Sequence, residues 1–185
     1  MTLPLEILKR YWKYPKFRLG QEQIIQSVLN QKDCIVLLST GGGKSLCFQI
    51  PALINDGICI VISPLIALMK DQVIALNNKG IKATALTNLN HWSDLERILD
   101  NCIYGDYKFL YLSPERLQNP LVQERIKMMN VNLIAVDEAH CISQWGHDFR
   151  PAYRSINTTK TLHPNVTTIA LTATATKRVV QDIKE

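Results

Sequence analysis

A glycine-rich turn followed by a lysine and a serine is the feature of this sequence best suited to chemistry. The segment Ser39–Ser45 reads Ser-Thr-Gly-Gly-Gly-Lys-Ser and directly follows the apolar run Cys34–Leu38. Glycines let backbone N–H groups turn toward an anion without clashing Cβ atoms, a lysine reaches β- and γ-phosphates, and a hydroxyl can bind Mg²⁺. We therefore predict a triphosphate site made by Thr40, Gly41, Gly42, Gly43, Lys44 and Ser45. The alternative is a simple glycine-rich turn, since the general pattern has glycine where Leu38 stands.

A pair of carboxylates closes another apolar run. Asp137 and Glu138 follow Leu133–Val136 and begin the tetrad Asp-Glu-Ala-His, which ends at His140. In enzymes that hydrolyse nucleoside triphosphates, an acidic side chain near the phosphate loop holds Mg²⁺ together with the loop hydroxyl. We predict that Asp137 and Ser45 hold Mg²⁺ and that Glu138 orients and deprotonates the attacking water. The alternative is a polar strand end exposed to solvent.

The thirteen residues after the tetrad, Cys141–Tyr153, contain three aromatic side chains, a glycine, a histidine and an arginine. They include Trp145, Phe149 and Arg150. Aromatic faces stack on unpaired bases, each worth about 1–3 kcal/mol, and arginine adds phosphate and cation–π contacts. The alternative is that the aromatic rings plug the core beneath a long loop.

Short apolar runs alternate with helical patterns along the chain. The expected strands are 34–38, 58–62, 82–86, 109–112, 133–136 and 168–171, and the expected helices are 46–52, 65–79, 93–103, 121–129 and 176–185. This alternation predicts an α/β fold with a mostly parallel sheet, helices on both faces and ligands at the carboxyl ends of the strands. The segment 3–30 is expected to form two helical stretches broken near Pro15, and Ser93 with Glu96 a capping box.

Composition limits the class of protein. The chain has 185 residues, 46% of them apolar, which is enough for one core and a single domain. Its 21 basic and 16 acidic side chains give a net charge of +5, which permits an anionic partner. Five scattered cysteines without a CxxC pair favour free thiols over disulfides or a zinc site. No apolar run reaches the roughly 18 residues that span a bilayer, so we expect no membrane contact and a cytoplasmic location, with the nucleoid if bacterial.

Taken in chain order, these motifs resemble the first RecA-like domain of a RecQ-family DNA helicase. The resemblance covers nearly all of the chain and includes residues 17–25, 40–49, 63–72, 111–117, 137–140, 141–153 and 170–175. The aromatic-rich loop directly after the DEAH tetrad points to this family rather than to other DEAH helicases. The resemblance implies a RecA-like P-loop NTPase domain over residues 1–185, with residues 1–30 as an adenine-recognition lead-in.

The resemblance also assigns roles to individual residues. Adenine recognition is implied for Tyr14, Arg18 and Gln21, and single-stranded DNA contacts for Ser63, Ser113, Gln144, Trp145, His147, Phe149 and Arg150. Catalytic roles are implied for Lys44, Asp137, Glu138 and His140, the last also reporting DNA to the ATP site, and coupling to domain movement for Thr172 and Thr174. The implied activity is that of an ATP- and Mg²⁺-dependent 3′–5′ DNA helicase on single-stranded and partly duplex DNA. The chain departs from the family pattern at Lys13, Ser39 and Ser113, where glycine, proline and threonine are common.

The family's second RecA-like, zinc-binding and winged-helix domains have no counterpart in these 185 residues. The second domain supplies arginines to the γ-phosphate, and such an arginine is worth about 10³–10⁵ in rate. We therefore expect this chain alone to bind ATP–Mg²⁺ weakly, to hydrolyse it poorly and to unwind no duplex, with the remaining helicase domains as its partners. One alternative is a nucleotide-responsive DNA-binding module without turnover. Another is a P-loop kinase, against which the DEAH tetrad and aromatic loop argue.

Overall fold

Six parallel strands form one sheet in the order β1-β6-β5-β2-β4-β3. The strands of this computed structural model are β1 (Cys34–Leu37), β2 (Ile58–Ile62), β3 (Ala83–Ala85), β4 (Phe109–Leu112), β5 (Val131–Val136) and β6 (Thr168–Thr172). The structure describes residues 3–39, 41, 43–87, 89, 91–146 and 148–185. The predicted α/β fold with a parallel sheet is confirmed.

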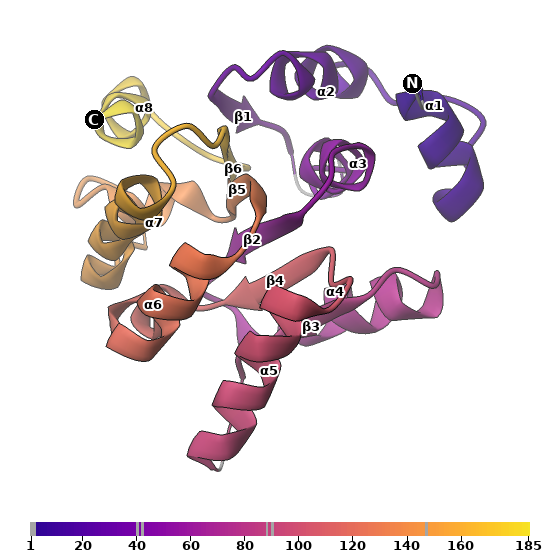
Figure 1. Ribbon diagram of the computed structural model, residues 1–185. Helices are drawn as coiled ribbons and strands as arrows, with labels where there is room; N and C mark the ends of the chain where they lie inside the picture. The colour runs from indigo at the N-terminus through magenta and orange to yellow at the C-terminus, as the bar shows by residue number, and fades with distance from the viewer. Residues whose placement is uncertain (1–2, 40, 42, 88, 90, 147) are drawn as a thin grey trace.

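Helices cover both faces of the sheet (Figure 1). One face carries α2 (Gln21–Leu29), α3 (Leu46–Ile54) and α4 (Ile66–Asn78), and the other α5 (Trp92–Tyr104), α6 (Pro120–Met128), α7 (Asn157–Leu162) and α8 (Lys177–Lys184). Before them, α1 (Pro4–Ile7) and the π-helical turn Leu8–Trp12 pack against α2 and α3. The chain thus has apolar packing on both faces of the sheet, with the lead-in segment beside α3.

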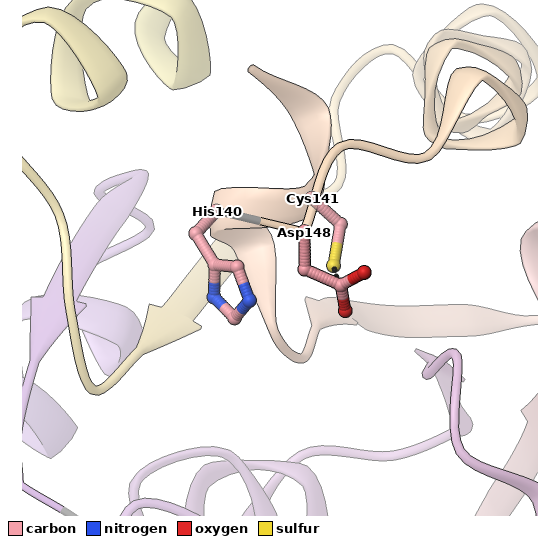
Figure 2. A group of neighbouring side chains, drawn as sticks. All are labelled: His140, Cys141 and Asp148. Atoms are coloured by element: carbon pink, nitrogen blue, oxygen red, sulfur yellow. Dashed lines mark hydrogen bonds between the residues drawn. The ribbon is translucent and has the colours of Figure 1, made fainter. Parts of the chain in front are cut away.

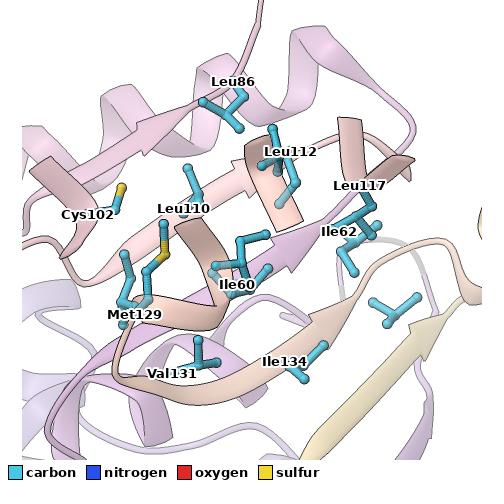
Figure 3. Packing of buried hydrophobic residues seen from close by; sticks show 14 of the residues in the cluster. Ile60, Ile62, Leu86, Cys102, Leu110, Leu112, Leu117, Met129, Val131 and Ile134 are labelled. Atoms are coloured by element: carbon cyan, nitrogen blue, oxygen red, sulfur yellow. The ribbon is translucent and has the colours of Figure 1, made fainter. Parts of the chain in front are cut away.

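Strand β2 shows why a continuous apolar run forms a strand that is buried on both faces of the sheet. Successive side chains of a strand point to opposite faces, so Ile58, Ile60 and Ile62 join one cluster and Cys59 and Val61 the other. All five side chains are buried. Figure 3 shows Ile60 and Ile62 beside Leu110 and Leu112 of the neighbouring strand.

Backbone hydrogen bonds continue beyond the carboxyl ends of the strands. The N–H of Leu38 donates to the carbonyl of Thr172 at 3.3 Å, and the N–H of Asp137 donates to the carbonyl of Ile62 at 2.8 Å. The N–H of Ser63 likewise donates to Leu112 at 3.1 Å. The segments that follow β1, β2 and β5 are therefore fixed to the ends of β6, β4 and β2 along one edge of the sheet.

The predicted strands and helices are present, with ends shifted by at most two residues. The segment before β1 also contains the two expected helical stretches. Sequence analysis missed α7 and three 3₁₀ helices, Pro114–Gln118, Ala139–Ile142 and Pro151–Ile156. Helix α7 reads Asn-Thr-Thr-Lys-Thr-Leu, which has weak helix propensity and little apolar periodicity.

The predicted capping box at Ser93 and Glu96 is wrong. Helix α5 starts one residue earlier than expected, with His91 at the N-cap and without a side-chain capping bond to the residues described. Ser93 consequently lies inside the first turn, where its hydroxyl is out of register for a cap. Over the part of the chain that the structure covers, no helix combines the length and apolar character needed to cross a bilayer.

Leu110→Ala is expected to lower the free energy of unfolding by about 2–5 kcal/mol, because the side chain is fully buried in the sheet and its loss leaves a cavity. Urea unfolding followed by circular dichroism measures the change. Leu19→Ala is the matched control, since Leu19 is 99% exposed, and should change stability by no more than about 0.5 kcal/mol. Equal losses in the two variants would contradict this description of the core.

Candidate active site

A cavity of about 900 Å³ joins the lead-in segment to the phosphate loop. Its lining includes Tyr14, Arg18 and Gln21 from the lead-in and Gly41, Gly43, Lys44 and Ser45 from the loop. The volume falls in the usual range for small-molecule sites. The structure therefore brings the predicted adenine-binding and phosphate-binding residues to one cavity, and Tyr14 is half-exposed in its wall. The predicted phosphate contacts of Thr40 and Gly42 lie outside the described residues.

Gln21 and Arg18 connect the start of α2 to the phosphate loop. The buried Gln21 side chain accepts a hydrogen bond from the Arg18 N–H at 2.8 Å and donates one to the Gly43 carbonyl at 3.1 Å. The Arg18 guanidinium donates to the Gly41 carbonyl. Two predicted adenine-binding residues thus also hold the loop backbone, which the sequence did not indicate. Their contact with adenine stays a prediction.

Left-handed backbone at two positions shapes the same region. Gly43 has φ +77°, and a Cβ there would lie 2.2 Å from Gln21 Nε2, so a side chain would disrupt the contact that holds the loop. Lys13 has φ +62°, a left-handed conformation that suits the glycine expected at this position from the family resemblance. Its ammonium donates to the Arg10 carbonyl at 2.7 Å and closes the preceding helical turn. The lead-in therefore keeps a left-handed turn despite the lysine.

The acidic pair lies at the end of β5, within electrostatic reach of Lys44. Burial raises the pKa of the Asp137 carboxyl and the Glu138 charge raises it further, against the hydrogen bond from the Glu138 N–H at 3.0 Å and the charge of Lys44. Glu138 has φ +51°, a strained conformation that concentrates at functional sites. A bound cation would relieve the cost of a buried carboxylate, and the Asp137 carboxylate and Ser45 hydroxyl are hard oxygen ligands of the kind Mg²⁺ prefers.

His140 connects the acidic pair to the end of β6. Its Nδ1 lies 2.8 Å from Thr172 Oγ1 and 3.4 Å from a carboxylate oxygen of Glu138. The Thr172 hydroxyl donates to the Thr174 carbonyl at 3.0 Å, so its oxygen accepts the hydrogen of His140 Nδ1. The structure thus brings His140 and both predicted coupling threonines into one hydrogen-bonded group, while the coupling role stays a prediction.

The aromatic-rich loop presents one ring to solvent. Trp145 is 58% exposed, and the Arg178 guanidinium of α8 lies 4.5 Å from the centre of its ring. The alternative that Trp145 plugs the core is therefore wrong. Phe149 and Arg150 are partly buried, and the Arg150 N–H donates to the Cys141 carbonyl at 2.9 Å. Gln144 is exposed beside Trp145, and the predicted contact of His147 lies outside the described residues.

The family model for DEAD/DEAH box helicases matches residues 18–183. The chain belongs to this helicase family. The chain is 46% identical to a probable ATP-dependent DNA helicase RecS of Bacillus subtilis (strain 168) over 99% of its own length and 37% of the relative's. It is 47% identical to the ATP-dependent DNA helicase RecQ of Haemophilus influenzae over 97% of its length and 29% of that protein. The chain spans about a third of the length of these curated relatives, and the resemblance to RecQ helicases is confirmed.

A solved structure shows the same fold at much lower identity. The helicase MrfA, in a crystal structure bound to DNA and AMPPNP, aligns with a TM-score of 0.75 and 16% identity over 99% of this chain and 28% of MrfA. At that identity the likeness concerns the fold alone. It agrees with the RecA-like architecture expected of a DEAD/DEAH box helicase domain.

The two serines predicted to contact DNA differ in accessibility. Ser63 is buried, and its hydroxyl accepts a hydrogen bond from the Leu65 N–H at 3.5 Å. Ser113, at the end of β4, is partly exposed. Sequence analysis treated them alike because both follow apolar strands, but the structure does not bring Ser63 to the surface.

His140, Cys141 and Asp148 form a side-chain group that the sequence analysis did not single out (Figure 2). Their ligand atoms lie within 4.8 Å of one another, a spacing that a metal site also shows. Burial, followed by the Asp148 charge, raises the pKa of the Cys141 thiol to about 11, so the thiol keeps the proton that a metal would displace. It donates that proton to Asp148 at 3.8 Å. The bond therefore connects Asp148 of the aromatic-rich loop back to Cys141 in the 3₁₀ helix Ala139–Ile142.

A second missed group lies behind the phosphate loop. Gln49, Gln72 and Tyr111 form a hydrogen-bonded chain that ends at Ser45. Gln49 and Tyr111 interrupt otherwise apolar segments, and buried polar groups need partners. A polar residue within an apolar segment indicates a buried hydrogen bond, but the sequence did not show that these bonds lead to Ser45.

Stability is expected to depend on pH through Asp137. A raised folded-state pKa means that the folded chain binds this proton more tightly than the unfolded chain, whose aspartates titrate near about 3.9. The contribution is therefore present below that value and is lost as pH rises through the folded-state pKa. Wild type should thus lose stability relative to Asp137→Asn as pH rises, measured by urea unfolding between pH 3.5 and about 8. The exposed Asp71 of α4 supplies the control Asp71→Asn. A wild type that gains stability relative to Asp137→Asn as pH rises would contradict the assignment.

Proposed function

We propose that this chain is the ATP-binding motor domain of a RecQ-type DNA helicase. The observation that carries the proposal is the single cavity shared by Tyr14, Arg18, Gln21 and the phosphate loop, together with the partly buried Asp137, whose carboxyl interacts electrostatically with Lys44. The family match and the ATP-dependent DNA helicases among its relatives support it. Because the chain spans about a third of those relatives, the 3′–5′ unwinding activity and the remaining helicase domains as partners also belong to the proposal.

Each side chain of the site has a defined part in the proposed ATP hydrolysis. Lys44 binds the β- and γ-phosphates, and Ser45 and Asp137 hold Mg²⁺, which when bound neutralises charge on the phosphate oxygens. Glu138 orients the attacking water and accepts its proton. His140 lies between Glu138 and Thr172 and contacts both, so a movement at the end of β6 would be transmitted through His140 to the general base Glu138.

The proposed contact with single-stranded DNA depends on the exposed Trp145 ring. A base can stack on this ring, and the neighbouring Arg178 supplies positive charge for a phosphate. The backbone N–H of Trp145 donates to Ser143 Oγ at 3.1 Å, which in turn donates to Asp182 of α8. The loop is therefore anchored beside its exposed ring. The cytoplasmic location expected from the sequence stays a prediction.

Lys44→Ala is expected to weaken binding of a fluorescent ATP analogue by about 10- to 100-fold, because it removes charge-assisted hydrogen bonds to phosphate. A fluorescence titration of the 185-residue chain with Mg²⁺ measures the affinity. Lys32→Ala removes an exposed lysine at the opposite end of β1 and should leave the affinity unchanged. Unaltered affinity in Lys44→Ala would contradict the proposed function.

Trp145→Ala is expected to weaken single-stranded DNA binding by about 5- to 100-fold through the loss of base stacking, while ATP-analogue binding stays unchanged. Fluorescence anisotropy of a labelled oligonucleotide measures the first quantity. Trp92→Ala is a close control, because Trp92 is 59% exposed and lies on α5, away from the aromatic-rich loop. Equal losses of DNA affinity in the two variants would place DNA elsewhere on the surface.

A further inference from the structure

A chain of three polar side chains behind the phosphate loop ends at the hydroxyl of Ser45, which its last member, Gln72, contacts. Gln49 of α3 donates from Nε2 to the Tyr111 hydroxyl at 3.3 Å, and Tyr111 of β4 donates to Gln72 Oε1 at 2.7 Å. Gln72 of α4 then donates from Nε2 to Ser45 Oγ at 3.4 Å. Side chains from two helices and a strand thus converge, through one chain of hydrogen bonds, on a single hydroxyl.

The order of donors leaves Ser45 suited to bind a cation. A hydroxyl has two lone pairs and one proton, and the Gln72 amide occupies one lone pair. The second lone pair is left for a metal ion, and the proton can turn to a phosphate oxygen. Ser45 stands at the N-cap of α3 with helical φ and ψ, and its side chain makes no capping bond to the described residues of that helix. The hydroxyl is therefore not committed to the helix it precedes.

The far end of this hydrogen-bonded chain is buried, whereas Gln72 and Ser45 are partly exposed. Tyr111 is 1% exposed and Gln49 is 5% exposed. Burial raises the pKa of the Tyr111 phenol, so the phenol keeps its proton and remains a donor near neutral pH. With Gln49 and Tyr111 buried, the order of donors is fixed, because reversing one donor would leave a buried polar group unpaired.

We propose that Gln72 and Tyr111 are positioning residues for Mg²⁺ binding. They hold the Ser45 hydroxyl in the orientation that faces the nucleotide cavity, and they do not themselves touch the metal. This inference rests on the proposed function, since the ligand concerned is Mg²⁺–ATP. Partners that orient a metal ligand typically contribute about 10- to 100-fold to metal affinity.

A purely structural role gives a different expectation. If the chain only satisfied buried polar groups, removing the Tyr111 hydroxyl would change stability but leave the response to Mg²⁺ intact. The positioning role predicts a loss that is specific to Mg²⁺. The two are separated by comparing nucleotide affinity with and without the metal.

The experiment titrates Mg²⁺ into the 185-residue chain at a fixed concentration of fluorescent ATP analogue, with a parallel binding curve in EDTA. Tyr111→Phe and Gln72→Met should each raise the Mg²⁺ midpoint by about 10-fold and leave the affinity in EDTA within about two-fold of wild type. Tyr107→Phe is the matched control, because it removes a hydroxyl just before the amino end of the same strand and should leave the midpoint unchanged. Thermal unfolding of each variant confirms that it is folded.

A double-substitution series sharpens the test. In the Ser45→Ala background, Tyr111→Phe should have no further effect on the Mg²⁺ midpoint, since the hydroxyl that it positions is gone. A midpoint for Tyr111→Phe equal to wild type, or the same loss in EDTA as in Mg²⁺, would overturn the inference alone. A wild-type chain whose nucleotide affinity is identical in EDTA and in Mg²⁺ would instead overturn the proposed Mg²⁺–ATP site.

Discussion

The parallel direction of all six strands is the constraint on which this site depends. It sends the segments after β1, β5 and β6 to one edge. Backbone hydrogen bonds from Leu38 to Thr172 and from Asp137 to Ile62 hold the first two of these segments against the neighbouring strands. Only short side-chain contacts are then needed to complete the arrangement, such as Gln21 to Gly43 and His140 to Thr172. The strand order brings the phosphate loop and the acidic strand end to the same edge of the sheet. Side-chain hydrogen bonds then fix the positions of the individual groups.

Several features of the site oppose folding of the empty chain. Asp137 is a partly buried carboxyl with a raised pKa, and Glu138 and Lys13 adopt left-handed backbone. Each costs free energy that the two apolar clusters on the faces of the sheet offset. Binding of Mg²⁺ and triphosphate would relieve the first cost, because a cation stabilises the ionised carboxyl. The site is therefore arranged to be more stable when occupied, which links ligand binding to stability.

Sequence alone was sufficient for the fold and for the place of the chemical groups along it. The uninterrupted apolar run Ile58–Ile62 indicates a strand buried on both faces, and motifs that follow such strands must gather at one edge. The sequence was insufficient to predict side-chain contacts between residues that lie far apart along the chain. Neither the contact of Gln21 with Gly43 nor the chain from Tyr111 to Ser45 leaves a local pattern, and the burial of Ser63 depends on packing between segments. The wrong cap at Ser93 came from a one-residue error in the start of α5, which periodicity does not resolve.

The most direct measurement is a crystal structure of the chain with AMP-PNP and Mn²⁺, in which anomalous scattering locates the metal. The account predicts one metal ion beside the β- and γ-phosphates, bound by Ser45 Oγ and held directly or through one water by Asp137, with the Lys44 ammonium on the same phosphates. A nucleotide bound elsewhere, or Lys44 and Asp137 directed into separate regions of the molecule, would contradict it.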